Sequence, residues 1–340
     1  MYNYKIFVPE ESADFYLAIE DLQLQVAAYV QSEEQSGRHL VYSKVFLSDI
    51  QNEQELFTGS LLYTQWLQPA NCTLVGQAPA NGKKIAVLVK TAPDNSGYLF
   101  KSMRLSDDDC VAQSSYSQTM ALLSRYAELM KEKGMNLADH LLRTWIYVAN
   151  IDMNYEGVVK ARNDFFRQYG LTPETHFVAS TGIGGYSATR QAKVAIDFLT
   201  AMANSQQDFK YLQALDHLNP THEYGVAFER GTRIKLNDAY QYFISGTASI
   251  DSKGNVLYLN NVLKQTNRLI ENIRALLADG DSTLNDVKYF IVYLRDFSDY
   301  NVVESYMRQH FPHVPRIILH AKVCRPQWLI EMECVAVKEQ

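Results

Sequence analysis

Two acidic residues, Glu331 and Glu333, interrupt an apolar run near the carboxyl end of the chain. A strand in this run would point both carboxyl groups to one face, because side chains alternate along a strand. Burying a carboxylate is expensive unless a cation lies nearby. The nearest cations are Arg316, in the preceding apolar run, and Arg325, in the turn between the runs. The pattern indicates a site for an acidic small molecule or, alternatively, a structural ion pair between Arg316 and Glu331.

The elements that carry these residues follow from the spacing of apolar side chains. Pro326 and Gln327 break the apolar pattern, which predicts two strands joined by a short loop. Upstream, the spacing predicts the order helix, strand, helix, strand, strand, and this order occurs twice, from about residue 116 and again from about residue 265. We therefore expect an α+β domain, a mixed sheet packed against two helices, present twice by duplication.

The repeat shows in matching short segments: Gln118-Thr119 and Gln265-Thr266, Asp152-Met-Asn154 and Asp299-Tyr-Asn301, Arg167-Gln168 and Arg308-Gln309, and Asp197 at the place of Glu331. The expected organisation is an amino-terminal domain over residues 1–205 with a β-rich extension at its start. A polar linker at 206–223 and a carboxyl-terminal domain at 224–340, which carries the main site, follow it. The first hundred residues show strand-like runs and no pattern that indicates chemistry.

Composition excludes several classes of protein. Hydrophobic residues make up 47% and charged residues 21%, as in soluble globular proteins. The net charge of −6 argues against a nucleic-acid partner, which requires clustered Lys and Arg. The four cysteines form no Cys-x-x-Cys pair and the histidines show no zinc-ligand spacing, so no metal is expected. The sequence shows neither a signal peptide nor an apolar run of membrane-spanning length, which predicts a cytoplasmic protein.

The segment Ser245-Gly246-Thr247 and the fifteen-residue separation of Arg316 from Glu331 resemble the Rid/YjgF family of reactive-intermediate deaminases, also labelled L-PSP endoribonucleases. This resemblance covers most of residues 224–337. The family's usual Gly-Pro-Tyr-Ser-Gln segment is replaced here by Val-Ala-Phe-Glu-Arg, residues 226–230. That departure argues against generic imine deamination.

A closer resemblance, from about Arg143 onward, is to the chorismatase family, which consists of two-domain relatives of the Rid fold. It rests on five segments: Arg143-Thr-Trp145-Ile-Tyr147, Thr181-Gly-Ile-Gly184, Tyr224-Gly225 with Phe228-Glu-Arg230, Ser245 to Ser249, and Cys324-Arg-Pro-Gln-Trp328-Leu-Ile-Glu331. The resemblance implies cleavage of the enol ether of chorismate, or of a related dicarboxylate, to pyruvate and either a hydroxybenzoate or a dihydroxycyclohexadiene acid. It implies no cofactor.

The resemblance also implies roles for particular residues. Glu331 is expected to be a general acid whose pKa is raised by its apolar surroundings and by Glu333. Arginine binds carboxylates through two parallel hydrogen bonds, so Arg316 and Arg230 are expected to hold those of the substrate. Tyr224 and the segment Ser245-Gly246-Thr247 are expected to form polar walls. Cys324 resembles the cysteine of members that make a hydroxybenzoate, although a lone cysteine in an apolar strand also serves as a packing residue.

Two other functions remain open. One is imine or enamine hydrolysis of the Rid type, with Arg316 holding the substrate carboxylate. The other is a non-catalytic protein that binds small ligands with the same fold. In each case the expected partner is a small anion, with no nucleic acid and no membrane. Because small Rid proteins form trimers, this chain is expected to be either a homo-oligomer or a monomer with internal pseudo-symmetry.

Overall fold

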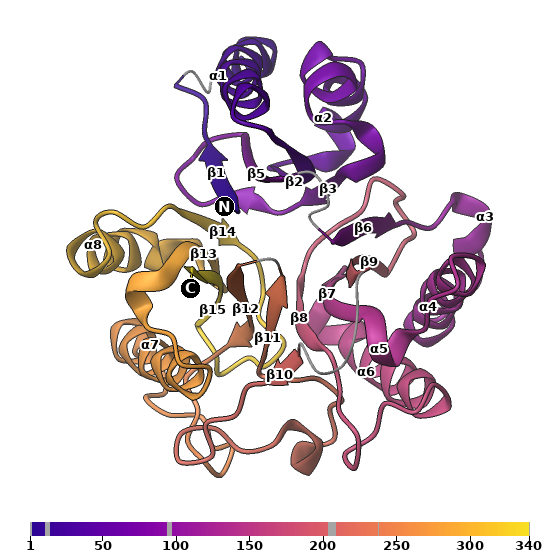
Figure 1. The fold of residues 1–340 in the computed structure, drawn as a ribbon, viewed down its shortest axis with the longest axis vertical. Helices are drawn as coiled ribbons and strands as arrows, with labels where there is room; N and C mark the ends of the chain where they lie inside the picture. The colour runs from indigo at the N-terminus through magenta and orange to yellow at the C-terminus, as the bar shows by residue number, and fades with distance from the viewer. Residues whose placement is uncertain (1, 11–13, 94–96, 203–208, 237, 340) are drawn as a thin grey trace.

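The computed structural model describes residues 2–10, 14–93, 97–202, 209–236 and 238–339, which form three sheets with helices packed against them (Figure 1). The first unit consists of β1 (Asn3–Phe7), α1 (Phe15–Gln35), β2 (Arg38–Leu47), α2 (Ile50–Thr58), β3 (Cys72–Gly76) and β5 (Ile85–Pro93). The second consists of β6 (Tyr98–Met103), α4 (Ser115–Glu132), β7 (Leu141–Val148), α6 (Ile151–Gln168), β8 (Ala179–Gly184) and β9 (Val194–Ala201).

The third unit consists of β10 (Phe209–Tyr211), β11 (Gly231–Leu236), β12 (Ala239–Thr247), α7 (Val262–Asp279), β13 (Val287–Leu294), α8 (Tyr300–His310), β14 (Arg316–His320) and β15 (Ile330–Glu339). The remaining elements are short: β4 (Ala78–Pro79), α3 (Asp107–Cys110), α5 (Leu137–His140), a π-helical turn at Leu62–Trp66, and 3₁₀ turns at Pro69–Asn71, Thr221–Tyr224, Leu284–Asp286 and Phe297–Asp299. No helix in the described ranges combines the length and apolar character that crossing a membrane would need.

The three units repeat one sheet topology. Their strand orders are β1-β5-β2-β3, β6-β9-β7-β8 and, within a seven-stranded sheet, β12-β15-β13-β14. The pairs β2–β3, β7–β8 and β13–β14 are parallel, as strands joined by a helical crossover must be. The other strand pairs in these orders are antiparallel. The two predicted α+β units are therefore present, and the first ninety residues form a third copy.

The prediction that the chain starts with a β-rich extension is wrong, because the long helix α1 is one of the main elements of this segment. Ala18, Ile19, Leu22, Val26 and Val30 recur at helical spacing and are buried against the first sheet. The expected linker 206–223 lies partly outside the described residues. Its described part is not free, because β10 pairs with β11 and extends the third sheet.

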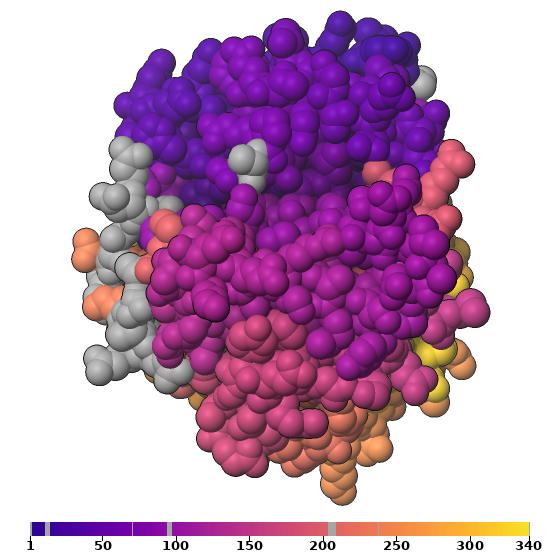
Figure 2. All heavy atoms as spheres, turned by 90° about the vertical axis from the view of Figure 1, so that its right-hand side faces the viewer, coloured from indigo at the N-terminus to yellow at the C-terminus, as the bar shows by residue number. Residues whose placement is uncertain are grey.

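The units surround a common centre, with their sheets facing inward and their helices outward (Figure 1). One large apolar cluster contains buried residues of all three units, such as Tyr42, Trp145 and Tyr289. In the space-filling view the indigo atoms of the first unit lie directly on the magenta atoms of the second (Figure 2). The chain therefore has a pseudo-threefold arrangement with three interfaces between units.

The strand registers show which residues correspond in the three units. Trp145 pairs with Thr181 and Asp197, Ile291 with Ile317 and Glu333, and Lys44 with Thr73 and Leu88. The predicted match of Asp197 to Glu331 is therefore wrong by two residues. Asp197 corresponds to Glu333 and Leu88, whereas Glu331 corresponds to Ala195 and Ala86.

Candidate active site

A small cavity lies at the interface between the second and third units. Its volume is about 30 Å³. The second unit contributes side chains of α6 and β8, and the third unit contributes β12, β15 and the segments before β11 and β15. The lining residues are Tyr155, Arg162, Ser180, Gly182, Tyr224, Phe228, Arg230, Gly246, Ala248, Ile250, Cys324, Trp328 and Glu331. Both units are therefore needed to build the site.

Glu331, the second residue of β15, is the acidic group of this cavity. Its side chain is buried, with a relative exposure of 4% for the residue. Burial and the neighbouring carboxyl of Glu333 raise the pKa of Glu331 to about 8, although Arg230 and Arg143 act against this increase. The carboxyl group is therefore protonated at neutral pH. A buried acid that keeps its proton at neutral pH can act as a general acid.

Gly246, at the end of β12, lies directly under this carboxyl group. A Cβ atom at position 246 would lie 2.0 Å from Glu331 Oε1, so only glycine leaves room for the acid. The Gly246 N–H donates a hydrogen bond of 2.9 Å to Thr181 Oγ1, which fixes β12 against β8 of the second unit. The Ser-Gly-Thr motif thus provides space for the acid.

Two buried arginines, Arg162 and Arg230, reach the cavity from opposite units. Their relative exposures are 3% and 8%, and burial lowers the pKa of both guanidinium groups. Arg162 Nε and Nη2 and Arg230 Nε have no hydrogen-bond partner among the described residues. Both guanidinium groups lie within 5.8 Å of the centre of the Phe228 ring. Buried donors without partners are costly, so this pair is suited to receive an anion.

Cys324 lies on the same wall as Tyr155 and is partly buried. Burial and the nearby Glu331 raise the pKa of the Cys324 thiol to about 12. The thiol is therefore protonated at neutral pH, which disfavours a role as a nucleophilic thiolate. Cys324 can offer a weak hydrogen bond or a small apolar surface to a ligand.

An outer groove of about 540 Å³ leads to the cavity, and Tyr155, Tyr224, Cys324 and Trp328 line both spaces. The Arg325 guanidinium lies over two of these rings, 5.1 Å from the centre of Tyr224 and 4.8 Å from that of Trp328. An inner space of about 30 Å³ has room for only a few waters. A larger ligand must therefore move part of this shared wall.

The structure brings together five of the predicted site residues: Glu331, Cys324, Arg230, Tyr224 and Gly246. Of these, Tyr224 lines both the cavity and the groove outside it, and burial raises the pKa of its hydroxyl.

Ser245 and Thr247 do not line the cavity but support it. Ser245 Oγ donates to the Glu229 carbonyl at 2.6 Å and accepts from the Ser180 N–H at 2.9 Å. Thr247 Oγ1 donates to the Ser245 carbonyl at 2.9 Å. Their hydroxyl groups hold β12 in place rather than facing a ligand.

Glu333 is also outside the cavity and binds the second unit. It accepts hydrogen bonds from Arg143 Nη2 at 2.9 Å, Trp145 Nε1 at 2.8 Å and Thr181 Oγ1 at 2.5 Å. This buried network joins β15 to β7 and β8. Glu333 therefore fixes the interface and acts on Glu331 through its charge.

The prediction that Arg316 and Glu331 share a site is wrong. Arg316 belongs to β14, which pairs with β13 on the edge opposite β15, so the two residues are not on neighbouring strands. Arg316 also begins its strand beside Phe290, whereas Glu331 pairs with Tyr293 near the other end of β13. Arg316 instead forms an ion pair of 2.8 Å with Glu304, at the interface with the first unit.

Sequence reasoning missed Arg162, Tyr155, Phe228 and Trp328 as lining residues. Arg162 carried a signal, because it lies on the apolar face of α6 together with Val158, Ala161 and Phe165. A charged residue on such a face needs a partner or a ligand. The aromatic residues carried no comparable signal, since aromatic side chains are common in cores.

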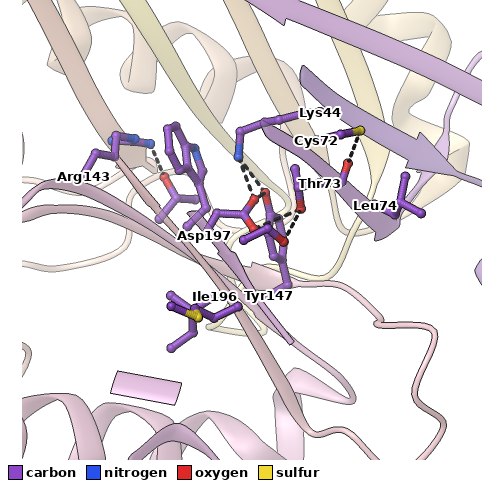
Figure 3. A network of polar contacts seen from close by, with 12 residues as sticks. Lys44, Cys72, Thr73, Leu74, Arg143, Tyr147, Ile196 and Asp197 are labelled. Atoms are coloured by element: carbon purple, nitrogen blue, oxygen red, sulfur yellow. Dashed lines mark hydrogen bonds and ion pairs between the residues drawn. The ribbon is translucent and has the colours of Figure 1, made fainter. Parts of the chain in front are cut away.

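Between the first and second units, a buried polar network surrounds Asp197, the residue that corresponds to Glu333 (Figure 3). Lys44 Nζ lies 3.1 Å from Asp197 Oδ2 and 2.9 Å from Tyr147 Oη, and Thr73 Oγ1 donates to Asp197 Oδ1 at 3.0 Å. Burial lowers the pKa of Lys44 to about 8, although Asp197 acts against this decrease. Among the described residues no group of three or more His, Cys, Asp or Glu side chains could hold a metal ion.

Comparisons with known proteins agree with this geometry. The family model of endoribonuclease L-PSP matches residues 233–338. A RutC family protein of Pyrococcus abyssi is 33% identical over 99 residues, which is 28% of this chain and 78% of that protein. The chain belongs to the RutC (Rid/YjgF) family. A second member of this family, the 3-aminoacrylate deaminase RutC of Acinetobacter baylyi, is 27% identical over 96 residues, 28% of this chain and 76% of that protein.

A solved structure extends the likeness beyond the Rid/YjgF match. The crystal structure of a chorismatase superposes with a TM-score of 0.70 and covers 99% of this chain and 98% of its own, at 19% sequence identity. The two proteins therefore share a fold over all three units. The α+β fold with Rid-like units that the sequence predicted is confirmed.

Proposed function

We propose that this chain is a chorismatase-type enzyme that cleaves the enol ether of chorismate or of a related dicarboxylate. The observation that carries the proposal is the buried carboxyl group of Glu331, whose pKa is raised to about 8, in a cavity with two buried arginines. Arg162 Nε and Nη2 and Arg230 Nε have no hydrogen-bond partner among the described residues. The shared fold with a chorismatase supports the same conclusion.

The charges of the cavity favour a substrate with two carboxylates. A neutral Glu331 leaves the positive charges of Arg162 and Arg230 without a carboxylate in the inner cavity. A dianion would compensate both charges and occupy the unpartnered donors, each through a charge-assisted hydrogen bond. Chorismate is such a dianion. A neutral ligand would leave two buried cations uncompensated, which is costly.

The reaction requires a proton donor and a water molecule. Glu331 donates its proton to the methylene carbon of the enol ether, which produces an oxocarbenium ion. Water adds to this ion, and the resulting hemiketal breaks its bond to the ring oxygen to release pyruvate and the ring alcohol. The proton released by the water returns to the Glu331 carboxylate, so the acid is regenerated. With water as the nucleophile the ring product is a dihydroxycyclohexadiene acid. In the alternative suggested by Cys324, the ring also loses one molecule of water to become aromatic, so that pyruvate and a hydroxybenzoate together contain the atoms of chorismate with no net uptake of water.

The decisive experiment measures pyruvate release from chorismate by the wild-type chain and by Glu331→Gln. Loss of a general acid lowers kcat by roughly 10²- to 10⁴-fold. The amide keeps the shape of the side chain, so the Kd for chorismate should change only a few-fold. Glu339→Gln, at the exposed end of the same strand, is the matched control and should keep wild-type turnover. Full turnover by Glu331→Gln would contradict the assignment of the acid.

A second candidate function is hydrolysis of an imine or enamine. It is favoured by the identity of 27% with a protein named as a 3-aminoacrylate deaminase. A protonated Glu331 could also donate to an enamine carbon. Ammonia release from an enamine substrate, without pyruvate release from chorismate, would select this function. Binding of chorismate without turnover of either substrate would select a non-catalytic ligand-binding protein.

A further inference from the structure

The wall shared by the inner cavity and the outer groove contains the aromatic side chains of Tyr155, Tyr224 and Trp328. The inner cavity has a volume of about 30 Å³, so a ring with two carboxylates enters only if one of these side chains moves. Arg230 lines the cavity but not the groove, and Arg325 lines the groove but not the cavity. The wall therefore stands between an outer and an inner guanidinium group.

Two of these aromatic side chains are fixed by their surroundings. Tyr155 is part of α6, so its backbone is held by the hydrogen bonds of the helix. Trp328 is buried, and the side chain of Gln265 binds the backbone on both sides of it. Gln265 Nε2 donates to the Gln327 carbonyl at 2.9 Å, and Gln265 Oε1 accepts from the Leu329 N–H at 2.9 Å. Moving either residue would break backbone hydrogen bonds.

Tyr224 is held less firmly. It ends the short 3₁₀ turn Thr221–Tyr224, and Gly225 follows it with a φ of +83°, in the left-handed region. Asn163 of α6 anchors the chain after this glycine, since its side chain donates to the Gly225 carbonyl at 2.7 Å and accepts from the Ala227 N–H at 3.1 Å. A glycine between a half-buried ring and an anchored segment is suited to act as a hinge.

Arg325 lies across the rings of Tyr224 and Trp328 on the groove side. Its guanidinium is 5.1 Å from the centre of the first ring and 4.8 Å from that of the second. These contacts favour the closed wall, because the face of an aromatic ring attracts a cation. The guanidinium is half-buried and makes no hydrogen bond or ion pair with the described residues. It can therefore leave the rings without breaking a stronger contact.

We propose that Tyr224 is a gate between the groove and the inner cavity, hinged at Gly225 and held closed by Arg325. Arg325 is thus a positioning residue, because it acts on the site through the ring of Tyr224. The need for a gate rests on the proposed function, since a ligand of a few atoms would not require one. Gate opening is measured by access to the cavity in the absence of substrate, so the gate and the proposed reaction can fail separately.

The test follows the alkylation by iodoacetamide of a thiol placed inside the cavity. Ala248 is buried and lines the cavity but not the groove, so Ala248→Cys, in a chain that also carries Cys324→Ala, provides this thiol. When the gate closes faster than the thiol reacts, the rate is proportional to the population of the open form. Arg325→Gln should raise the rate about tenfold, because the cation loses its contacts with two rings. Arg325→Lys keeps a cation over the rings and should stay within about threefold of the rate with Arg325.

A change at the hinge tests the same gate without altering any charge. Gly225→Ala adds a Cβ that meets no atom within 4 Å, so its effect is the strain of a left-handed backbone in the closed form. Because opening releases this strain, the alkylation rate should rise roughly five- to thirtyfold. Gly82→Ala, in the turn before β5, is the matched control, since Gly82 has a φ of +81° and the same open space. This control should leave the rate unchanged.

The buried thiols of the chain show whether a variant has opened its gate or unfolded. Cys72, Cys110 and Cys334 are buried, so unfolding exposes them together with position 248, whereas gate opening exposes position 248 alone. Faster alkylation at position 248, with unchanged alkylation of the three buried thiols in the mass spectra of the peptides, supports the gate. An unchanged rate at position 248 in either Arg325→Gln or Gly225→Ala, or a rise that all four thiols share, would overturn it.

Discussion

The substitution Gly246→Ala tests how closely the fold around Glu331 controls the chemistry. A Cβ atom at position 246 would lie 2.0 Å from Glu331 Oε1, 2.9 Å from Glu331 Cδ and 3.0 Å from Thr181 Cγ2. Ordinary contact begins at 3.4 Å, so the carboxyl oxygen must retreat by about 1.4 Å. The side chain of Glu331 must turn to do so, because the pairs Ile244–Cys334 and Thr247–Met332 hold the two backbones close together here.

A misplacement of about 1 Å in a reacting group can lower the rate roughly 10²-fold. We therefore expect kcat/KM for pyruvate release to fall by about 10²-fold in Gly246→Ala, with a smaller change in the Kd for chorismate. The assay couples pyruvate to the oxidation of NADH by lactate dehydrogenase and follows absorbance.

The matched control is Gly59→Ala, after α2. Its Cβ would meet Glu55 O at 3.5 Å and Leu56 O at 3.7 Å, which are ordinary contacts, and its backbone is in the right-handed helical region. This variant should keep wild-type activity. Wild-type kcat/KM in Gly246→Ala, with a folded chain shown by its unfolding midpoint, would refute the placement of the acid against Gly246.

Three further predictions concern pH, the thiol and the interface. Because the acid must be protonated and its pKa is about 8, kcat/KM should fall about tenfold per pH unit above pH 8. The free energy of unfolding should also fall as the pH rises from about 4.5 to about 8, since the folded chain then holds a proton that the unfolded chain has lost. Glu331→Gln should remove both effects. Cys324→Ala should keep pyruvate release within about tenfold, because a thiol of pKa about 12 is not ionised, and a loss beyond 10³-fold would show that the thiol takes part in the chemistry. Glu333→Gln should lower the free energy of unfolding in urea by about 3 kcal/mol, since it leaves Arg143 buried without its carboxylate, and an unchanged urea midpoint would show that the pair contributes nothing.

The sequence could predict the carboxyl-terminal acid because its signal is local. Glu331 stands in an apolar strand, and Gly246 and Arg230 lie in segments with a recognisable resemblance. The partner of the acid could not be predicted in the same way. Arg316 is close to Glu331 along the chain, but β13 lies between their strands, and only the sheet order reveals this.

Arg162 illustrates the opposite error. It is distant from Glu331 in the sequence and reaches the same cavity because the second unit packs its α6 face against the third. The first unit was missed for a related reason. Its strands are visible in the sequence, but the helical spacing of the apolar residues in α1 stands among them and is less evident. Contacts between units depend on packing that short-range patterns do not encode.

The pseudo-threefold arrangement explains how the proposed acid can be present at one interface and absent from the other two. Identical subunits would place the same residues at all three interfaces, whereas a single chain allows each to differ. At the position of Glu331 the other two interfaces have Ala195 and Ala86, so neither has this acid.

The neighbouring position diverges in a different way. Glu333 corresponds to Asp197 and Leu88, which means that two interfaces keep a buried carboxylate and one is apolar. Asp197 is paired with Lys44 and Arg104, and Glu333 is paired with Arg143. In both cases the carboxylate binds one unit to the next. An interface gains a proton to donate only where a second carboxyl group stands at the position of Glu331. Burial and the charge of Glu333 raise the pKa of that group, so it stays protonated. The structural carboxylate is thus a condition for the proposed acid, because its negative charge helps Glu331 to keep its proton.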